Sequence, residues 1–211
     1  MPESTKYPDS ELPFEYTSSQ KNDKTGDTFR KLITGFFDSI QVVVIALAIF
    51  VVVYLWILSP HQVRGPSMMP NFYDRELLLA DKLTLTLGQL QRGDVIIFKY
   101  NDAQDHIKRI IGMGGDRVMV KGGKVYVNGS LLDESYLPLD RVTESGAFMQ
   151  ESVEYTVPEG QLIVMGDNRP DSYDSRAYGF MDPSIHTIKG RAWIVYWPFE
   201  TARVVERFDF E

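Results

Sequence analysis

The feature that most constrains this chain is an apolar run from Ile40 to Leu58, in which every residue except Gln41 is apolar or aromatic. The run contains 19 residues and no charge. As an α-helix it would be about 28 Å long, close to the hydrocarbon thickness of a bilayer. Tyr54 and Trp56 stand toward one end, where aromatic rings favour the membrane interface. The run therefore predicts a transmembrane helix over residues 40–58.

Two other interpretations of the run are a buried core helix and a removed signal peptide. A core helix would carry charges on one face, and the run has none. The apolar part of a signal peptide is shorter and is followed by a small-residue cleavage site, whereas SPHQVR follows this run. Both alternatives are therefore weaker than a membrane span.

The segments on either side of the run differ in composition. Residues 1 to about 30 are rich in Ser, Thr, Pro and charged side chains, so residues 1–39 are expected to form a disordered tail. Basic residues near the run are more numerous before it than after it: Lys21, Lys24, Arg30 and Lys31, against Arg64 and Arg75. This bias predicts a cytoplasmic tail and an extracytoplasmic domain over residues 59–211.

Charge and cysteine content exclude several function classes. The formal net charge is −7, which gives no electrostatic support to nucleic-acid binding. The chain has no cysteine, which excludes thiolate catalysis, a thiolate zinc site and a disulfide framework.

Beyond Pro70 the apolar residues form the short runs that are typical of strands. These runs are RELLLADK, GDVIIFKY, VEYTVPEG, GQLIVMGD and RAWIVYWPF. RVMVKGGKVYVNG alternates around a Gly-Gly pair, which predicts a hairpin. No amphipathic helical period of convincing length follows Pro70. The domain is therefore predicted to be mainly β.

The stretch HQVRGPSMMPNF holds a candidate nucleophile, Ser67. Gly65 and Pro66 favour a tight turn before it, and Pro70 stops any long helix after it. A serine in such a turn can expose its Oγ and leave its own backbone N–H free to stabilise an oxyanion. A structural turn serine is the alternative interpretation.

The stretch DHIKRIIGMGGD holds a candidate general base, Lys108. Strand alternation places Lys108 on the same face as Ile110. A lysine among apolar side chains loses hydration, so its pKa falls and its neutral amine can accept a proton. A lysine at a strand end that keeps its ammonium in water is the alternative. His106 competes as the base, because it lies two residues away on the same face.

A third stretch, MGDNRPDSYDSRAYGF, packs polar side chains into a loop after an apolar strand. These side chains are Asp167, Asn168, Asp171, Ser172, Asp174, Ser175 and Arg176. The run lacks the ligand spacing and central glycine of a calcium loop. A solvated turn remains an alternative, but the density of polar groups beside a buried strand indicates an ordered network.

Together, and in this order after one membrane span, the segments VRGPSMMP, IKRIIGMGGDRV and VMGDNRPDSYDSRAYG resemble type I signal peptidases. These membrane-bound serine proteases remove signal peptides from exported proteins. The resemblance implies a mainly β catalytic domain with a smaller inserted β subdomain over roughly residues 115–158, preceded by one transmembrane helix. It implies that Ser67 is the nucleophile, that Lys108 rather than His106 is the general base, and that no cofactor is needed.

The resemblance also assigns supporting roles around this pair. Ser172 would hydrogen-bond Lys108 and orient it, while Asp174 and Arg176 would brace the loop. The Ser67 backbone N–H would lie in the oxyanion hole. Some members of the family have a serine at the position of Gly65, whose hydroxyl completes that hole, so the second donor here is open.

The substrate implied by the resemblance is the signal peptide of an exported preprotein, cut after small residues in an Ala-X-Ala pattern through an acyl-enzyme. It would bind as an extended strand against Gln62, Val63, Arg64, Gly65, Met68, Asp105, His106 and Ile107. The enzyme would act as a monomer in the bacterial plasma membrane, with its catalytic domain on the extracytoplasmic face. The lipid bilayer is thus an expected partner.

Three rival interpretations are set against this one. A self-cleaving repressor-type protease also uses Ser and Lys, but such proteins are soluble and lack a span such as Ile40–Leu58. A single-pass membrane protein whose β domain only binds partners would cleave no signal peptide. An inactive homologue would not be expected to keep Ser67, Lys108, Ser172 and Asp174 together.

Overall fold

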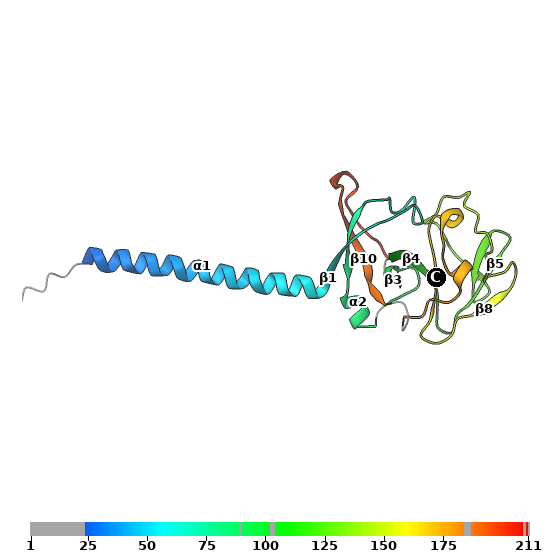
Figure 1. Ribbon diagram of the computed structural model, residues 1–211, viewed down its shortest axis with the longest axis horizontal. Coiled ribbons are helices and arrows are strands. Elements are labelled where there is room, and N and C mark those ends of the chain that lie inside the picture. The colour runs from blue at the N-terminus through cyan, green and yellow to red at the C-terminus, as the bar shows by residue number, and fades with distance from the viewer. Residues whose placement is uncertain (1–23, 89, 102–103, 184–186, 209, 211) are drawn as a thin grey trace, which may run out of the picture. The chain divides into compact units, whose positions relative to one another are not determined.

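The computed structural model describes residues 24–211 except 89, 102–103, 184–186, 209 and 211. The chain divides into two compact units, Met1–Ile49 and Phe50–Glu211. One long helix, α1, covers Lys24–Ile57, and its segment Arg30–Ile57 is long and apolar enough to cross a membrane (Figure 1). The helix therefore contains the predicted span, apart from Leu58.

The helix begins earlier than the sequence indicated. The expectation of a disordered tail through residue 39 is wrong for residues 24–39, which are helical, while residues 1–23 lie outside the described residues. Leu32, Ile33, Phe36 and Phe37 continue a helical spacing before the uncharged run. Once a helix is nucleated, each further residue adds a backbone hydrogen bond at low cost, so the helix extends toward the N-terminus beyond the uncharged run.

The larger sheet of the second unit has seven strands, all paired antiparallel. Its order is β1-β2-β10-β3-β4-β9, with β11 paired to β10. The strands are β1 (Leu58–Gln62), β2 (Leu77–Asp81), β3 (Val95–Asn101), β4 (Gln104–Met113), β9 (Leu162–Met165), β10 (Ile188–Trp197) and β11 (Arg203–Val204). β1 precedes Ser67 in the chain, and β4 carries Lys108. The sheet thus brings these two strands into one layer.

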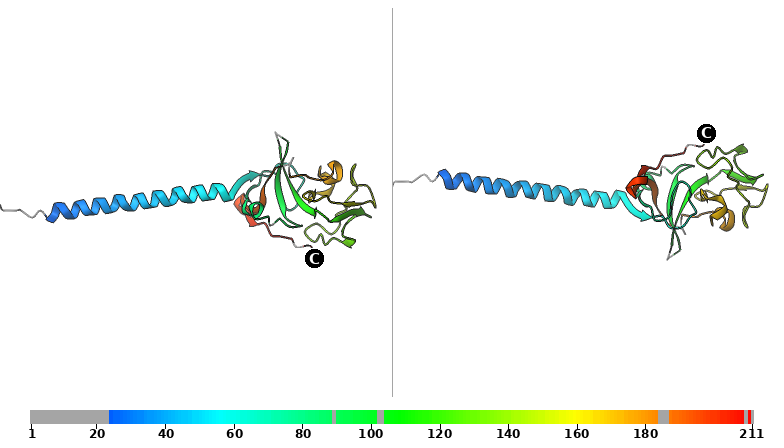
Figure 2. Two further views of the ribbon diagram at one scale, coloured as in Figure 1. Left: turned by 90° about the horizontal axis from the view of Figure 1, so that it is seen from below. Right: turned by 90° about the horizontal axis from the view of Figure 1, so that it is seen from above.

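The smaller sheet has four strands in the order β7-β6-β5-β8. They are β5 (Arg117–Lys121), β6 (Lys124–Val127), β7 (Ser130–Leu131) and β8 (Glu154–Thr156). The predicted Gly-Gly hairpin joins β5 to β6, and Gly122 and Gly123 have φ angles of 56° and 76°, the left-handed values that a two-residue hairpin turn requires. β5 and β8 lie at the end of the domain away from β1 and β10 (Figures 1 and 2). The four strands fall within residues 115–158, and the boundaries of an inserted subdomain stay a prediction.

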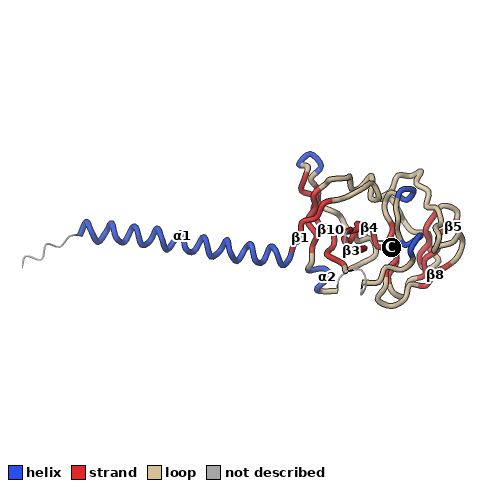
Figure 3. Tube along the Cα trace, in the orientation of Figure 1, coloured by secondary structure: helices blue, strands red, loops and turns tan. Residues whose placement is uncertain are grey.

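Strands and loops make up nearly all of this unit, as Figure 3 shows. After α1, the described helical turns are only three or four residues long: α2 (Leu83–Thr86), η1 (Arg169–Asp171), α3 (Ser175–Tyr178) and η2 (Phe199–Thr201). Each predicted apolar run after Pro70 forms a strand, so the mainly β prediction is confirmed.

Candidate active site

Ser67 lies in a turn that is anchored in the core. Gly65 has a φ of 83°, a left-handed conformation that glycine adopts without strain. The Met69 amide donates to the Pro66 carbonyl at 3.0 Å and closes the turn. Met68, the next residue after Ser67, is fully buried in a core cluster. The turn therefore holds Ser67 at a partly exposed position over a fixed base.

A second loop holds the Ser67 turn from the other side. The Asn168 amide donates to the Ser67 carbonyl at 3.0 Å, and its side chain donates to the Pro66 carbonyl at 3.1 Å. The Gly65 amide donates to Asp74 Oδ1 at 2.8 Å. The Ser67 backbone N–H has no acceptor among the residues that the structure describes. It is therefore available to an incoming carbonyl oxygen, whereas the Gly65 N–H is already engaged.

Lys108 reaches Ser67 from the middle of β4. Its Nζ lies 2.8 Å from Ser67 Oγ and 3.1 Å from the Ile107 carbonyl, and the residue is only 3% exposed. Burial lowers the pKa of Lys108 to about 8, although the Asp174 and Asp167 carboxylates act in the opposite direction. The amine is thus partly neutral near physiological pH, within hydrogen-bond distance of one hydroxyl.

His106, the competing base, is positioned differently. Its ring stacks on Tyr100 at a centroid distance of 4.4 Å and an interplanar angle of 3°. The described hydrogen bond to Ser67 Oγ comes from Lys108. Strand alternation places both side chains on one face, and the tertiary structure brings Lys108 to the serine.

The polar loop after β9 is an ordered network, as expected. The Asp174 carboxylate is fully buried and accepts from the Gly166 amide at 3.0 Å and from Arg176 Nη2 at 2.8 Å. Burial would raise the pKa of Asp174, but hydrogen bonding and charge from Arg176 lower it. Arg176 Nη2 also donates to the Arg169 carbonyl at 2.6 Å, and this hydrogen bond joins two parts of the loop.

Ser172 does not make the expected bond to Lys108. Its Oγ is buried without a partner in hydrogen-bond geometry among the described residues. It is nevertheless close enough to Asp174 to help lower the pKa of that carboxyl. The described contacts of Lys108 Nζ are with Ser67 Oγ and the Ile107 carbonyl instead.

Sequence analysis missed a buried ion pair beside Lys108. Arg109 Nη2 and Nε bond the two oxygens of Asp167 at 2.7 and 2.9 Å, and Asn71 Nδ2 donates to the same carboxylate at 2.8 Å. These contacts link β4, the loop after β9 and the chain after Ser67. One signal was present: an arginine inside the apolar stretch IKRII must be paired if it is buried.

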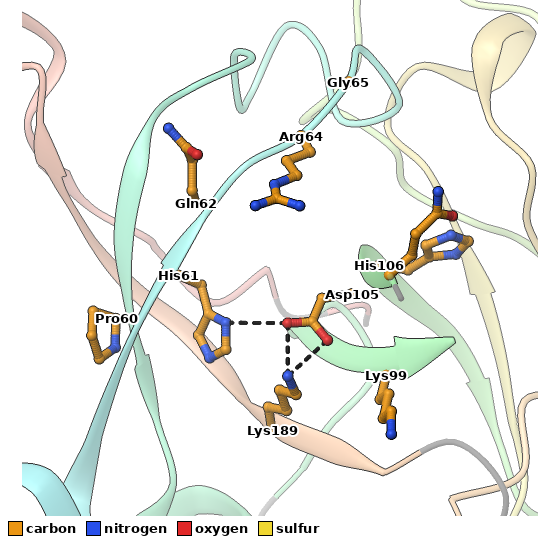
Figure 4. A pocket seen from close by; sticks show the side chains of 10 residues that line it. Pro60, His61, Gln62, Arg64, Gly65, Lys99, Asp105, His106 and Lys189 are labelled. Atoms are coloured by element: carbon orange, nitrogen blue, oxygen red, sulfur yellow. Dashed lines mark hydrogen bonds and ion pairs between the residues drawn. The ribbon is translucent and has the colours of Figure 1, made fainter. Parts of the chain in front are cut away.

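A cavity of about 660 Å³ opens beside the Ser67 turn (Figure 4). It is lined by Pro60, His61, Gln62, Arg64, Gly65, Lys99, Gln104, Asp105, His106 and Lys189. Five of the predicted substrate-binding residues are in this set: Gln62, Arg64, Gly65, Asp105 and His106.

A second cavity of about 20 Å³ adjoins the first, and both are lined by His61 and Asp105. The predicted residues Val63 and Ile107 line it, together with Leu78 and Ile97. Met68, also predicted to bind substrate, is fully buried and lines neither cavity. No group of three or more His, Cys, Asp or Glu suited to a metal ion occurs in the described part of the chain.

Comparisons with known proteins agree on one family. The model of the signal peptidase family, peptidase S26, matches residues 36–197. Signal peptidase I of Bacillus caldolyticus is 37% identical over 74% of this chain and 88% of its own. Signal peptidase IB of Staphylococcus aureus is 32% identical over 74% of this chain and 87% of its own. A crystal structure of a signal peptidase I from Enterococcus faecalis is 33% identical, with a TM-score of 0.40 over 48% of this chain and 95% of that one. The chain therefore belongs to the signal peptidase I family of serine endopeptidases, which cleave signal peptides.

Proposed function

We propose that this protein is a membrane-bound signal peptidase in which Ser67 is the nucleophile and Lys108 the general base. The observation that supports the proposal most strongly is the 2.8 Å contact between Lys108 Nζ and Ser67 Oγ. A nucleophile and a base at that distance are the minimum requirement for hydroxyl activation. The pKa of about 8 at Lys108 supplies the second requirement, a fraction of neutral amine at working pH.

The reaction follows from these two groups. Ser67 Oγ attacks the scissile carbonyl carbon while its proton passes to the neutral Lys108 Nζ. The tetrahedral oxyanion accepts a hydrogen bond from the Ser67 N–H, and a second donor is not assigned. Collapse breaks the C–N bond, Lys108 protonates the departing amine, and an ester to Ser67 remains. Water then gives a proton to Lys108 and attacks the ester carbonyl carbon. Collapse breaks the C–Oγ bond, Lys108 returns the proton to Ser67 Oγ, and the signal peptide acid is released.

The sheet leaves room for an extended substrate. β1 is at one end of the strand order, and the N-terminal part of β4 pairs with β3, whereas its pairing with β9 begins at Arg109. Residues of β1 and β4 line both cavities together. A peptide that lies between β1 and the N-terminal part of β4 can therefore add backbone hydrogen bonds to strand edges on both sides.

The small cavity supports a preference for small residues. Its volume of about 20 Å³ suits a methyl group, and Val63, Leu78, Ile97 and Ile107 form the apolar part of its wall. A volume of this order holds about one water-sized probe. We therefore propose that alanine-sized side chains precede the cleaved bond, in the Ala-X-Ala pattern.

Anchoring in a membrane is the third part of the proposal. The segment Arg30–Ile57 is long and apolar enough to span a bilayer. The basic residues before it favour an orientation with the catalytic domain outside the cytoplasm of a bacterial cell, and we propose this location because exported preproteins emerge there. Confinement of enzyme and substrate to one membrane raises their effective concentration. We propose that one chain is sufficient for activity.

The proposal is tested by cleavage of a labelled preprotein with purified full-length chain in detergent. Ser67→Ala and Lys108→Met are each expected to lower turnover by about 10⁴-fold or more, because nucleophile and base act as a unit. His106→Ala is expected to have a mild effect and serves as the matched control on the same strand face. A loss in His106→Ala equal to that in Lys108→Met would show that the base is wrongly assigned. A wild type that cleaves nothing would favour a binding function.

A further inference from the structure

The larger cavity holds a cluster of charged and polar groups that the reaction above does not use. Asp105 on β4 accepts from Lys189 Nζ of β10 at 2.8 Å, and His61 Nδ1 of β1 lies 3.7 Å from the same carboxylate (Figure 4). The side chain of His61 is only 13% exposed, and its Nε2 has no partner among the described residues. Three strands that are distant in sequence thus contribute one group each.

The charge balance of this lining is positive. Apart from Lys99, which has a further interaction, Arg64 and Lys189 give two positive charges against the one negative charge of Asp105, a balance of 2 − 1 = +1. Burial lowers the pKa of His61, so the imidazole is neutral near pH 7 and does not alter this balance. The small cavity next to it shares polar residues with this lining and adds Val63, Leu78, Ile97 and Ile107, so it is the more apolar of the two.

The position of the cavity relative to Ser67 indicates which part of a substrate it meets. The chain runs from Pro60 and His61, in the cavity wall, through Gly65 to Ser67. A substrate strand advances about 3.3 Å per residue, as does the strand beside it. For a substrate strand that runs parallel to β1 with its scissile carbonyl at Ser67, the β1 end of the cavity therefore faces the residues roughly four to six positions before the cleaved bond.

We propose that this cavity, in which Arg64 and Lys189 outnumber Asp105, is a specificity subsite that favours an acidic over a basic residue upstream of the small residues at the cleavage point. The proposal rests on the proposed function, since it needs a substrate strand in the gap between β1 and β4. A carboxylate in the cavity gains attraction from the excess positive charge, whereas a lysine or arginine is repelled.

The experiment is a charge scan of peptide substrates with the full-length enzyme in detergent at pH 7 and low salt. Peptides carry Asp, Asn or Lys at one position at a time, from six residues before the cleaved bond to two after it. The expected ratio of kcat/KM for Asp over Lys is about two- to fivefold four to six positions before the bond, the range for partly exposed charge pairs. The ratio should approach one at high salt, because ions screen such pairs.

Two variants test whether the charges of the cavity lining cause the preference for Asp over Lys. Lys189→Glu changes the balance of the lining to 1 − 2 = −1, so the ratio is expected to fall to one or below. Lys124→Glu makes the same change of charge on β6, outside this cavity, and should keep the wild-type ratio.

Two results overturn the subsite. One is a wild-type ratio of one or below at every position upstream of the bond. The other is a wild-type preference that Lys189→Glu leaves unchanged. If Lys189→Glu fails to fold, the salt dependence of the wild-type ratio decides instead. Failure of the proposed function is distinguishable, because the Asn peptides would then also remain uncleaved or would be cleaved equally by Ser67→Ala.

Discussion

At the scale of single residues, burial of Lys108 makes the charged form of its amine unfavourable. An ammonium group removed from water is costly unless it is paired, and Lys108 is 3% exposed. Asp174 and Asp167 favour its charged form, but burial outweighs them and the pKa falls to about 8. Asp174 is already bound to Arg176, and Asp167 to Arg109, so neither carboxylate is reserved for the lysine. The same arrangement that destabilises the charge leaves part of the amine neutral, as the proposed role of general base requires.

The pH dependence of activity follows from this pKa. Lys108 must be neutral to accept the Ser67 proton, so kcat/KM should rise with pH through about 8 and level off above it. Near pH 7 only about one molecule in ten has the neutral amine, so activity should increase about tenfold from pH 7 to a plateau. Steady-state cleavage of a peptide between pH 6 and 10 measures this. His106→Ala should keep the midpoint, and a flat profile with chemistry rate-limiting would contradict the assignment.

Removal of the Lys108 amine should have opposite effects on activity and on stability. Lys108→Met keeps the stem and removes the buried charge, so the free energy of unfolding at pH 7 should rise by about 1–3 kcal/mol. The folded-state pKa lies below the unfolded value of 10.5, so wild type gains stability as pH rises from about 8 to 10.5. The difference between variant and wild type should therefore shrink over that range.

Urea unfolding in detergent at several pH values measures this difference. Lys189→Met is the control, because Lys189 is 37% exposed and paired with Asp105. An inactive Lys108→Met that is also less stable at pH 7 would show that the buried ammonium is not costly.

At the scale of elements, the site depends on close contact between the end of β9 and the Ser67 turn. Gly166 follows β9 directly, and a Cβ at this position would lie 2.2 Å from Ser172 Oγ and 2.4 Å from the Ser67 carbonyl oxygen. Both distances are below any van der Waals contact. The two loops can therefore meet only because residue 166 has no side chain.

Gly166→Ala should disable the enzyme without replacing any reacting group. The methyl group must displace the Ser67 turn or the Ser172 loop, and a shift of about 1 Å at a reacting atom can lower kcat by about 100-fold. Gly35→Ala is the matched control, since a Cβ at Gly35 meets nothing within 4 Å. Wild-type kcat in Gly166→Ala would show that the Ser67 turn tolerates displacement.

At the scale of the whole molecule, one long helix and one mainly β unit make up the described chain. The helix exposes large apolar side chains along its length, including Leu47, Phe50 and Leu55. So much exposed apolar surface is unusual in a soluble protein and suits the interior of a bilayer.

The orientation in the membrane can be tested directly. Alkaline extraction should leave the full chain in bacterial membranes. Protease added to the cytoplasmic face of sealed vesicles should remove only the N-terminal tail and leave residues 59–211 protected. Replacing Lys21, Lys24, Arg30 and Lys31 by glutamine should weaken this orientation. Digestion of the β domain from the cytoplasmic face in wild type would contradict it.

Local sequence determined the strands, the hairpin, the apolar run and the candidate pair Ser67 and Lys108, because side-chain periodicity and turn chemistry act over a few residues. Only the tertiary structure decided that Ser172 does not bond the lysine and that Arg109 pairs with Asp167. Local pattern alone left His106 as a competitor and only the resemblance favoured Lys108, whereas the tertiary structure brought Lys108 into contact with Ser67. It also assembled His61, Asp105 and Lys189 in one cavity. These outcomes depend on the strand order β1-β2-β10-β3-β4-β9, which places segments far apart in the chain side by side. No local pattern encodes such an order, since it is selected by burial of the whole core.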